Sequence, residues 1–323
     1  MKRGHGSSRP PRQAAKGARK SAHDDCEQGL VVATHGRHVV VEQPDGQRLI
    51  CHPRGKKSEA VVGDRVRWQL TQEASDEGVI VEVSERRNLL YRQDEWRSKS
   101  FAANLDQLLM WIAVEPVFSE AQLTRALIAA HAADIPVTIV LNKIDLPGAD
   151  AARQRLAPYV AMGYRVVELS LKAEAGAARE QVLPLLEDRA SLVLGPSGAG
   201  KSTLINTLLP EARAEVGEIS QALNSGRHTT TTSHWYWLDD ARVGAVIDSP
   251  GFQEFGLHHI PAVELARHMP DLAAHMNDCR FHNCTHRQEP GCAVQAAVAA
   301  GQISPIRLSL FTDFFDELSQ PRW

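Results

Sequence analysis

The sequence predicts three folded parts in a row: a small β-barrel, an α/β domain with a parallel sheet, and a helical domain that holds a metal. Three patterns indicate them. Five short strands separated by turn residues occupy residues 28–97, strands alternate with helices over residues 98–260, and three cysteines cluster within residues 261–323. A chain of 323 residues that is 43% hydrophobic is long enough for more than one core.

The first part, residues 28–97, contains five apolar strands rich in Val, Ile and Trp, with Gly, Pro or Asp in the turns between them. The strands are Leu30–Thr34, Val39–Glu42, Arg48–Cys51, Arg65–Leu70 and Gly78–Val83. Five strands with hairpin turns favour a barrel of the OB-fold type. Such barrels often bind single-stranded nucleic acid, so we expect RNA contact, with a purely structural barrel as the alternative.

The residues before the barrel differ sharply in charge from the rest. Residues 1–23 carry seven Lys and Arg and no Asp or Glu, which leaves 29 basic residues against all 39 acidic ones elsewhere, a formal charge of −10. Their Gly, Ser, Pro and Arg content predicts a disordered basic tail over residues 1–27. This tail is either a solvated leader or an arm that binds RNA phosphates.

The sequence contains neither a membrane-length apolar run nor a segment like a secretory signal, and this predicts where the protein is located. The longest apolar runs, such as Leu108–Val114 and Ile135–Leu141, are far shorter than the roughly 20 residues of a membrane helix. The basic N-terminus has no apolar stretch behind it, so it does not resemble a secretory signal. We therefore expect a cytoplasmic protein that does not enter a membrane.

The second part, residues 98–260, alternates strands with helices, which is typical of a parallel α/β sheet. The expected strands are 108–114, 137–141, 165–169, 190–194 and 245–247, and the expected helices are 119–133, 149–162, 176–187 and 202–209. The third part, residues 261–323, is expected to be helical, and Arg307–Leu318 is its clearest amphipathic helix.

A phosphate-binding loop follows the fourth of these strands. Residues 195–202 read G-P-S-G-A-G-K-S and match G-x-x-x-x-G-K-[ST] between a strand and a helix, as that motif requires. Backbone N–H groups and the helix N-terminus would face the phosphates, Lys201 would reach the β- and γ-phosphates, and Ser202 would bind Mg²⁺. The predicted nucleotide-binding residues here are Gly195, Pro196, Ser197, Gly198, Ala199, Gly200, Lys201, Ser202 and Thr203.

Two further motifs complete a guanine-nucleotide site. Asp248 and Gly251 form D-x-x-G after a buried strand, so Asp248 would hold Mg²⁺ through water and the Gly251 N–H would contact the γ-phosphate. Residues 142–145 read N-K-I-D, and Asp145 can accept N1–H and the exocyclic N–H of guanine, which adenine does not offer. The base-binding residues are then Asn142, Lys143, Ile144 and Asp145. Ser170, Leu171 and Lys172 read S-L-K, which resembles the GTPase motif S-A-K whose backbone supports the guanine.

The order of these motifs is unusual. In ordinary GTPases the phosphate loop comes first, whereas here N-K-x-D and S-L-K precede it and D-x-x-G follows. The set is complete but circularly permuted, which a compact domain tolerates because its chain ends often lie close together. The sequence therefore predicts a circularly permuted P-loop GTPase domain that binds GTP or GDP with Mg²⁺.

The cysteines predict a structural zinc site. Cys279, Cys284 and Cys292 lie within fourteen residues, and the chain has five cysteines in all, an odd number that argues against a disulfide framework. Three thiolates with one imidazole, from His286 or His282, fill a tetrahedral Zn²⁺ site and leave no position for a substrate.

Together these motifs resemble the RsgA (YjeQ-type) family of small ribosomal subunit biogenesis GTPases, over roughly residues 28–320. The resemblance also rests on A-A-N-L-D-Q at residues 102–107 and G-R-H-T-T-T at residues 226–231. It implies GTP hydrolysis stimulated by the 30S subunit during late maturation, contact with 16S rRNA, and His286 as the fourth zinc ligand. We expect the protein to act as a monomer.

The residue that activates the attacking water is predicted from the D-x-x-G motif and from the family resemblance. Phe252 occupies the position after D-x-x-G where many GTPases carry Gln, and it cannot polarise water. His228, which the resemblance places in the switch loop, is the candidate that orients or deprotonates water, and a structural or RNA-contacting histidine is the alternative. Thr229 or Thr230 would bind Mg²⁺ in the closed state. Other readings are a passive RNA- or protein-binding module and a GTPase of the large subunit.

Overall fold

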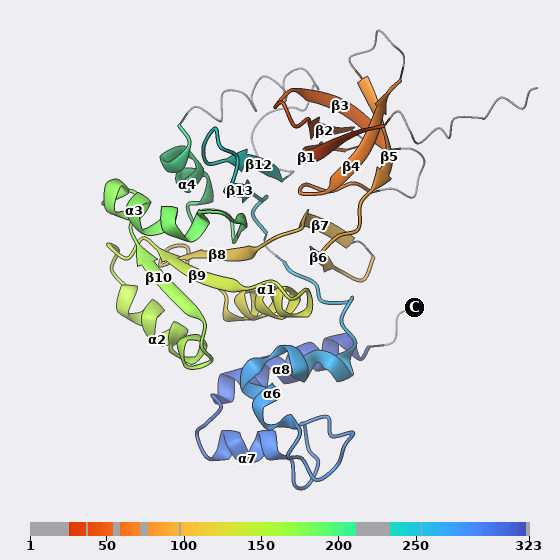
Figure 1. Cartoon of the computed structure of the whole chain (residues 1–323). Coiled ribbons are helices and arrows are strands. Elements are labelled where there is room, and N and C mark those ends of the chain that lie inside the picture. The colour runs from red at the N-terminus through yellow and green to blue at the C-terminus, as the bar shows by residue number, and fades with distance from the viewer. Residues whose placement is uncertain are drawn as a thin grey trace, which may run out of the picture.

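The structure is a computed structural model that describes residues 26–36, 38–53, 59–71, 77–96, 98–210, 233–252 and 254–320. The three predicted parts follow one another as a barrel, an α/β domain and a helical domain (Figure 1). Most of the predicted tail, residues 1–25, lies outside the described residues. The same holds for His228, Thr229 and Thr230.

The N-terminal part is a closed five-stranded barrel, as predicted. Its strands are β1 (Glu27–His35), β2 (His38–Glu42), β3 (Arg48–Pro53), β4 (Arg65–Leu70) and β5 (Glu77–Val83). β1 pairs with both β2 and β4, and β3 pairs with β5, so the ring closes. Alternate residues such as Val39 and Val41 point inward and pack with Trp68 and Ile80, which gives the barrel its own core.

The central sheet carries the strands of the predicted α/β domain. β8 (Gln107–Ala113), β9 (Val137–Asn142), β10 (Arg165–Leu169), β11 (Ala190–Leu194) and β13 (Ala245–Asp248) run parallel in the order β10-β9-β8-β11-β13. Every residue of β8 is buried, because helices cover both faces of the sheet.

Two layers of helices account for this burial. α1 (Glu120–Ala132) and α2 (Ala149–Ala161) pack on the face to which Leu108 and Met110 point. α3 (Ala175–Leu186) and α4 (Lys201–Leu208) pack on the face of Leu109 and Trp111. The predicted strands and helices of this domain agree with the structure to within one or two residues at each end.

An antiparallel strand that the sequence pattern did not predict completes the sheet. β12 (His234–Trp237) pairs with β13 at the edge and also with β1, where Ala33 lies opposite His234. The barrel and the central sheet are thereby joined into one run of eleven hydrogen-bonded strands. Glu42 of the barrel reinforces the junction, because its buried carboxylate accepts a 2.6 Å hydrogen bond from the Trp237 indole N–H.

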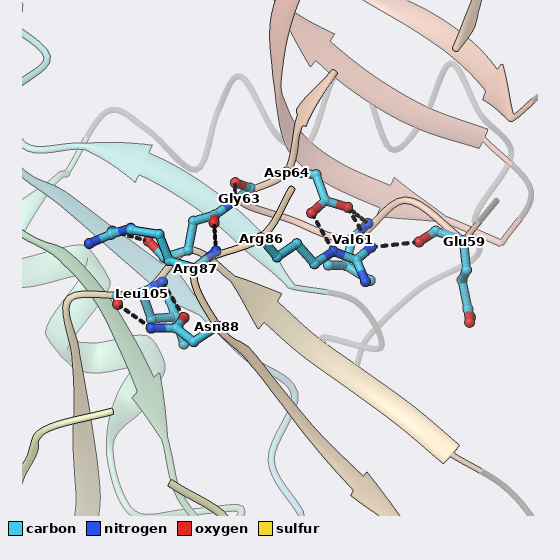
Figure 2. Close-up of polar contacts among 9 residues, drawn as sticks. Glu59, Val61, Gly63, Asp64, Arg86, Arg87, Asn88 and Leu105 are labelled. Atoms are coloured by element: carbon cyan, nitrogen blue, oxygen red, sulfur yellow. Dashed lines mark hydrogen bonds and ion pairs between the residues drawn. The ribbon is translucent and has the colours of Figure 1, made fainter. Parts of the chain in front are cut away.

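A second feature absent from the prediction is the hairpin of β6 (Leu89–Gln93) and β7 (Ser98–Ala103), which spans the expected boundary near residue 97. Figure 2 shows how its ends are fastened to the barrel. Arg86 donates to both oxygens of the fully buried Asp64 carboxylate at 2.7 and 2.8 Å. The Asn104 amide donates to the Gly63 carbonyl at 2.9 Å.

The C-terminal part is helical, as predicted. It consists of η1 (Ala262–His268), α6 (Pro270–Met276), α7 (Ala293–Ala299) and α8 (Pro305–Leu318). Arg307 of α8 fastens it to the central domain: this buried guanidinium pairs with Asp271 at 2.7 Å and donates to the Thr124 hydroxyl of α1 at 2.8 Å. Within the described residues, no helix combines the length and the apolar character needed to span a membrane.

Candidate nucleotide and metal sites

The phosphate loop connects β11 to α4 at the carboxyl end of the parallel strands. Gly198 and Gly200 have φ values of +80° and +104°, which a side chain would make costly. A Cβ on Gly195 would lie 1.9 Å from the Trp111 carbonyl, so only glycine allows the loop to pass this close to β8. The sequence motif thus takes the tight, glycine-dependent turn that a phosphate cradle requires.

Lys201, the first residue of α4, lies within this loop. Its ammonium donates to the carbonyls of Gly195 at 2.7 Å and Pro196 at 3.0 Å. Burial lowers the pKa of Lys201, and the nearby Asp248 carboxylate opposes that shift, because an anion favours the charged ammonium. Ser202 and Thr203 follow on the first turn of α4, and Ser202 is exposed.

The D-x-x-G residues lie directly beside the loop. Asp248, which is buried, ends β13 opposite Val193 of β11, so the two motifs occupy adjacent parallel strands. A Cβ on Gly251 would lie 3.1 Å from the backbone of Ser197 and 3.3 Å from the Lys201 ammonium nitrogen. The Gly251 backbone therefore lies against the phosphate loop, close to the Lys201 ammonium.

The N-K-x-D residues follow β9. Ser170, at the end of β10, ties this loop to the S-L-K segment: its hydroxyl donates to the Asp145 carboxylate at 2.6 Å and accepts the Asp145 N–H at 3.0 Å. Asp145 itself is exposed. Lys143, at φ +64°, extends its ammonium to the Gly198 carbonyl at 3.0 Å and to the Glu115 carbonyl. Ile144, Leu171 and Lys172 complete the two loops.

Asn142 holds the base-binding and phosphate-binding loops together. Its side-chain carbonyl accepts the N–H groups of Lys143 at 2.8 Å and Leu171 at 3.1 Å, and its amide donates to the Ala199 carbonyl at 2.9 Å. Only 2% of Asn142 is exposed, so these contacts are shielded from water. The Trp111 indole N–H donates to the same Ala199 carbonyl at 3.1 Å. Sequence reasoning assigned Asn142 only to its own loop and missed this link.

The predicted zinc ligands also come together. Ligand atoms of Cys279, Cys284, His286 and Cys292 all lie within 4.8 Å of one another, whereas His282 is exposed and outside this group. The His286 Nδ1 lies 3.5 Å from the Cys279 sulfur and 3.6 Å from the Cys292 sulfur, and the two sulfurs are 4.0 Å apart. Ligands of a tetrahedral zinc ion would be about 3.5–3.8 Å apart.

The surroundings of these ligands suit a metal. Backbone N–H groups of His286 and Ala293 point at the sulfurs of Cys284 and Cys279, both at 3.4 Å, as donors do toward thiolates. Burial lowers the pKa of His286, which favours the neutral imidazole that a metal ion binds. The donor set therefore fits a structural zinc ion with four protein ligands and no open position.

The model of the RsgA GTPase family matches residues 83–258, more than half of the chain. The chain belongs to the RsgA GTPase family. A relative from Variovorax paradoxus (strain S110), named small ribosomal subunit biogenesis GTPase RsgA, is 59% identical over 98% of this chain and 99% of its own length. A relative of the same name from Burkholderia pseudomallei (strain K96243) is 52% identical over 96% of both chains.

Solved structures agree with this membership of the RsgA family. The crystal structure of YjeQ from Thermotoga maritima covers 92% of this chain and 100% of its own, with a TM-score of 0.69 and 29% identity. YloQ, described as a circularly permuted GTPase, covers 95% of this chain and 100% of its own, with a TM-score of 0.67 and 28% identity. The permuted motif order predicted from the sequence is therefore confirmed as a property of the fold.

Proposed function

We propose that this protein hydrolyses GTP to GDP and phosphate on the small ribosomal subunit, as a late maturation factor or checkpoint. One observation carries the assignment: Asn142 joins the guanine-selective loop to the phosphate loop, so that base and phosphates would be bound together. The names of the two relatives described above supply the small subunit as the place of action. Such a factor would work in the cytoplasm.

The site residues then take the following roles. Asp145 accepts the two guanine N–H groups, and Lys143 covers the base. Lys201 and the phosphate-loop N–H groups hold the β- and γ-phosphates. Mg²⁺, bound by Ser202 and, through water, by Asp248, would neutralise charge as it develops on the transferred phosphoryl group.

The water-orienting group has to come from outside D-x-x-G. Phe252 is 3% exposed and packs edge-on against Phe255 at 5.5 Å between ring centres, so it is part of the core and has no group that activates water. We propose His228 for this role, with Thr229 or Thr230 as the further Mg²⁺ ligand. Slow turnover by the protein alone is the expected consequence, with acceleration when the 30S subunit orders the loop.

The regions on either side of the GTPase domain would help the protein bind the small ribosomal subunit. The barrel and the basic tail would contact 16S rRNA. The zinc ion would hold the loop of residues 279–292 in shape, because the one large apolar side chain of that loop, Phe281, is exposed and does not contribute to a core. We propose that one protein molecule acts alone on each subunit. Nothing in this assignment requires a membrane.

The test is GTP turnover by the purified protein with and without 30S subunits, using 50S subunits and ATP as controls. Guanine-specific stimulation by 30S subunits alone is the expected result, and loss of that stimulation in His228→Ala would support the catalytic assignment. Stimulation by 50S subunits, or none, would contradict action on the small subunit. Failure to hydrolyse GTP under any condition would favour a passive binding module.

A further inference from the structure

The segment just after D-x-x-G is docked on the β6–β7 hairpin. In residues 254–258, here called the docked segment, the Gly256 carbonyl accepts the Gln93 N–H at 3.1 Å, and the His258 N–H donates to the Gln93 carbonyl at 2.9 Å. Gln93 and Leu257 form a parallel β-bridge, and the Arg92 guanidinium donates to the Glu254 carbonyl. The docked segment therefore pairs with the edge of β6 through one isolated β-bridge, in the manner of a short extra strand.

Gly256 makes this docking sterically possible. A Cβ on Gly256 would lie 2.4 Å from the Gln93 carbonyl oxygen and 2.4 Å from an Asp94 carboxylate oxygen. The φ of Gly256 is not in the left-handed region, so an alanine would adopt this backbone without strain. The glycine is required by the close approach to β6, and a methyl group there would push the two strands apart.

Side chains extend the contact back to the phosphate loop. Phe255 stacks on Phe101 of β7, with ring centres 5.8 Å apart and planes 11° apart, and it meets Phe252 edge-on. Phe252 in turn forms a parallel β-bridge with Pro196 of the phosphate loop. A continuous, buried path therefore leads from the nucleotide-binding loop through three aromatic rings to the hairpin.

The hairpin and the docked segment lead onward to both outer domains. The Ala103 N–H at the end of β7 donates to the Val62 carbonyl of the barrel at 2.8 Å. The Asp64–Arg86 ion pair in Figure 2 adds a second link between the barrel and the chain that leads into β6. On its other side the docked segment continues into η1 of the metal domain (Figure 1). A displacement of the docked segment would thus reach the barrel through the hairpin and the metal domain through the chain itself.

We propose that the contact between Gly256 and β6 transmits the nucleotide state of the D-x-x-G loop to the β6–β7 hairpin, which makes Gly256 a positioning residue for ribosome-stimulated GTP hydrolysis. The second half of this inference rests on the function proposed above. Gly251 and the docked segment are separated by only a few residues, so a shift of Gly251 toward a γ-phosphate pulls directly on the strand that Gly256 anchors.

The experiment compares Gly256→Ala with Gly176→Ala, a matched control in α3 where an added Cβ meets nothing within 4 Å. Neither residue belongs to the nucleotide site, so affinities for fluorescent GDP and GTP analogues and intrinsic turnover should stay within about twofold of wild type. Stimulation by 30S subunits should fall in Gly256→Ala by a factor between about 5 and 150, the usual range of coupling between sites. Wild-type stimulation in this variant would overturn the proposal.

A second readout separates this inference from the proposed function. Hydrogen exchange of residues 89–103 in the wild type should differ between the GDP-bound and GTP-analogue-bound protein, and the difference should vanish in Gly256→Ala. If the wild type shows that difference without stimulation by 30S subunits, the ribosomal assignment fails and the transmission stands. If hydrogen exchange of residues 89–103 is the same in the GDP-bound and GTP-analogue-bound wild type, the proposed transmission from the D-x-x-G loop to the hairpin is refuted. Phe101→Leu, which weakens the Phe255 stack, tests the same path should Gly256→Ala not fold.

Discussion

Replacing Asn142 with alanine should weaken guanine nucleotide binding, because this side chain joins the base-binding and phosphate-binding loops. The change removes three hydrogen bonds: one donated to Ala199 and two accepted from Lys143 and Leu171. All three join parts of the protein to one another and none involves the nucleotide itself. Their loss therefore acts by loosening the arrangement of the loops, and the nucleotide then has to restore that arrangement on binding.

The magnitude follows from the three contacts. A neutral hydrogen bond contributes about 1 kcal/mol net, so the three together contribute about 3 kcal/mol. The Ala199 carbonyl keeps its bond from Trp111, whereas the N–H groups of Lys143 and Leu171 would both lose the acceptor that Asn142 provides. Most of the cost therefore arises in the N-K-x-D and S-L-K loops. Since about 1.4 kcal/mol is a factor of ten, the dissociation constant should rise about 100-fold.

The assay is a titration with fluorescent GDP and a GTP analogue, with circular dichroism as the check on folding. Asn206→Ala is the matched control, because Asn206 is an exposed asparagine on α4. It should bind nucleotide like the wild type. A dissociation constant for Asn142→Ala within threefold of wild type would refute the reasoning, since it would mean that the two loops are held in place without this side chain.

Three further predictions concern the base, the metal and the barrel junction. Asp145→Asn should weaken GTP binding and shift preference toward xanthine nucleotides, as a competition assay would detect; unchanged preference would remove Asp145 from base recognition. Chelation of zinc, or Cys284→Ser, should lower the melting temperature and release about one zinc ion per chain by metal analysis. Burial lowers the pKa of His234 to about 4. Its unfolded pKa is near 6.5, so its stabilising contribution is complete above that pH and is lost as the pH falls toward 4, by about 3 kcal/mol. His234→Gln should flatten that pH dependence of the melting temperature, and an unchanged slope would contradict the assignment.

The sequence alone determined the elements and motifs that depend on local pattern. The strands before and after the phosphate loop were predicted closely, because continuous apolar runs bounded by glycine are typical of buried parallel strands. The nucleotide-binding motifs could also be assigned from the sequence, because each needs particular residues at fixed spacing directly after a strand. The four-ligand metal cluster likewise follows from short spacing within one domain.

Only the tertiary structure decided how these parts are joined. The four-residue β12 is too short to give a clear periodic signal. It becomes a strand because it lies between β13, its neighbour in the chain, and β1, a partner far away in the sequence. Gly256 is one of many glycines in the sequence, and its close approach to Gln93 depends on a hairpin more than 150 residues earlier in the chain. Contacts of this kind carry no local signature, because either partner alone would be compatible with many other environments.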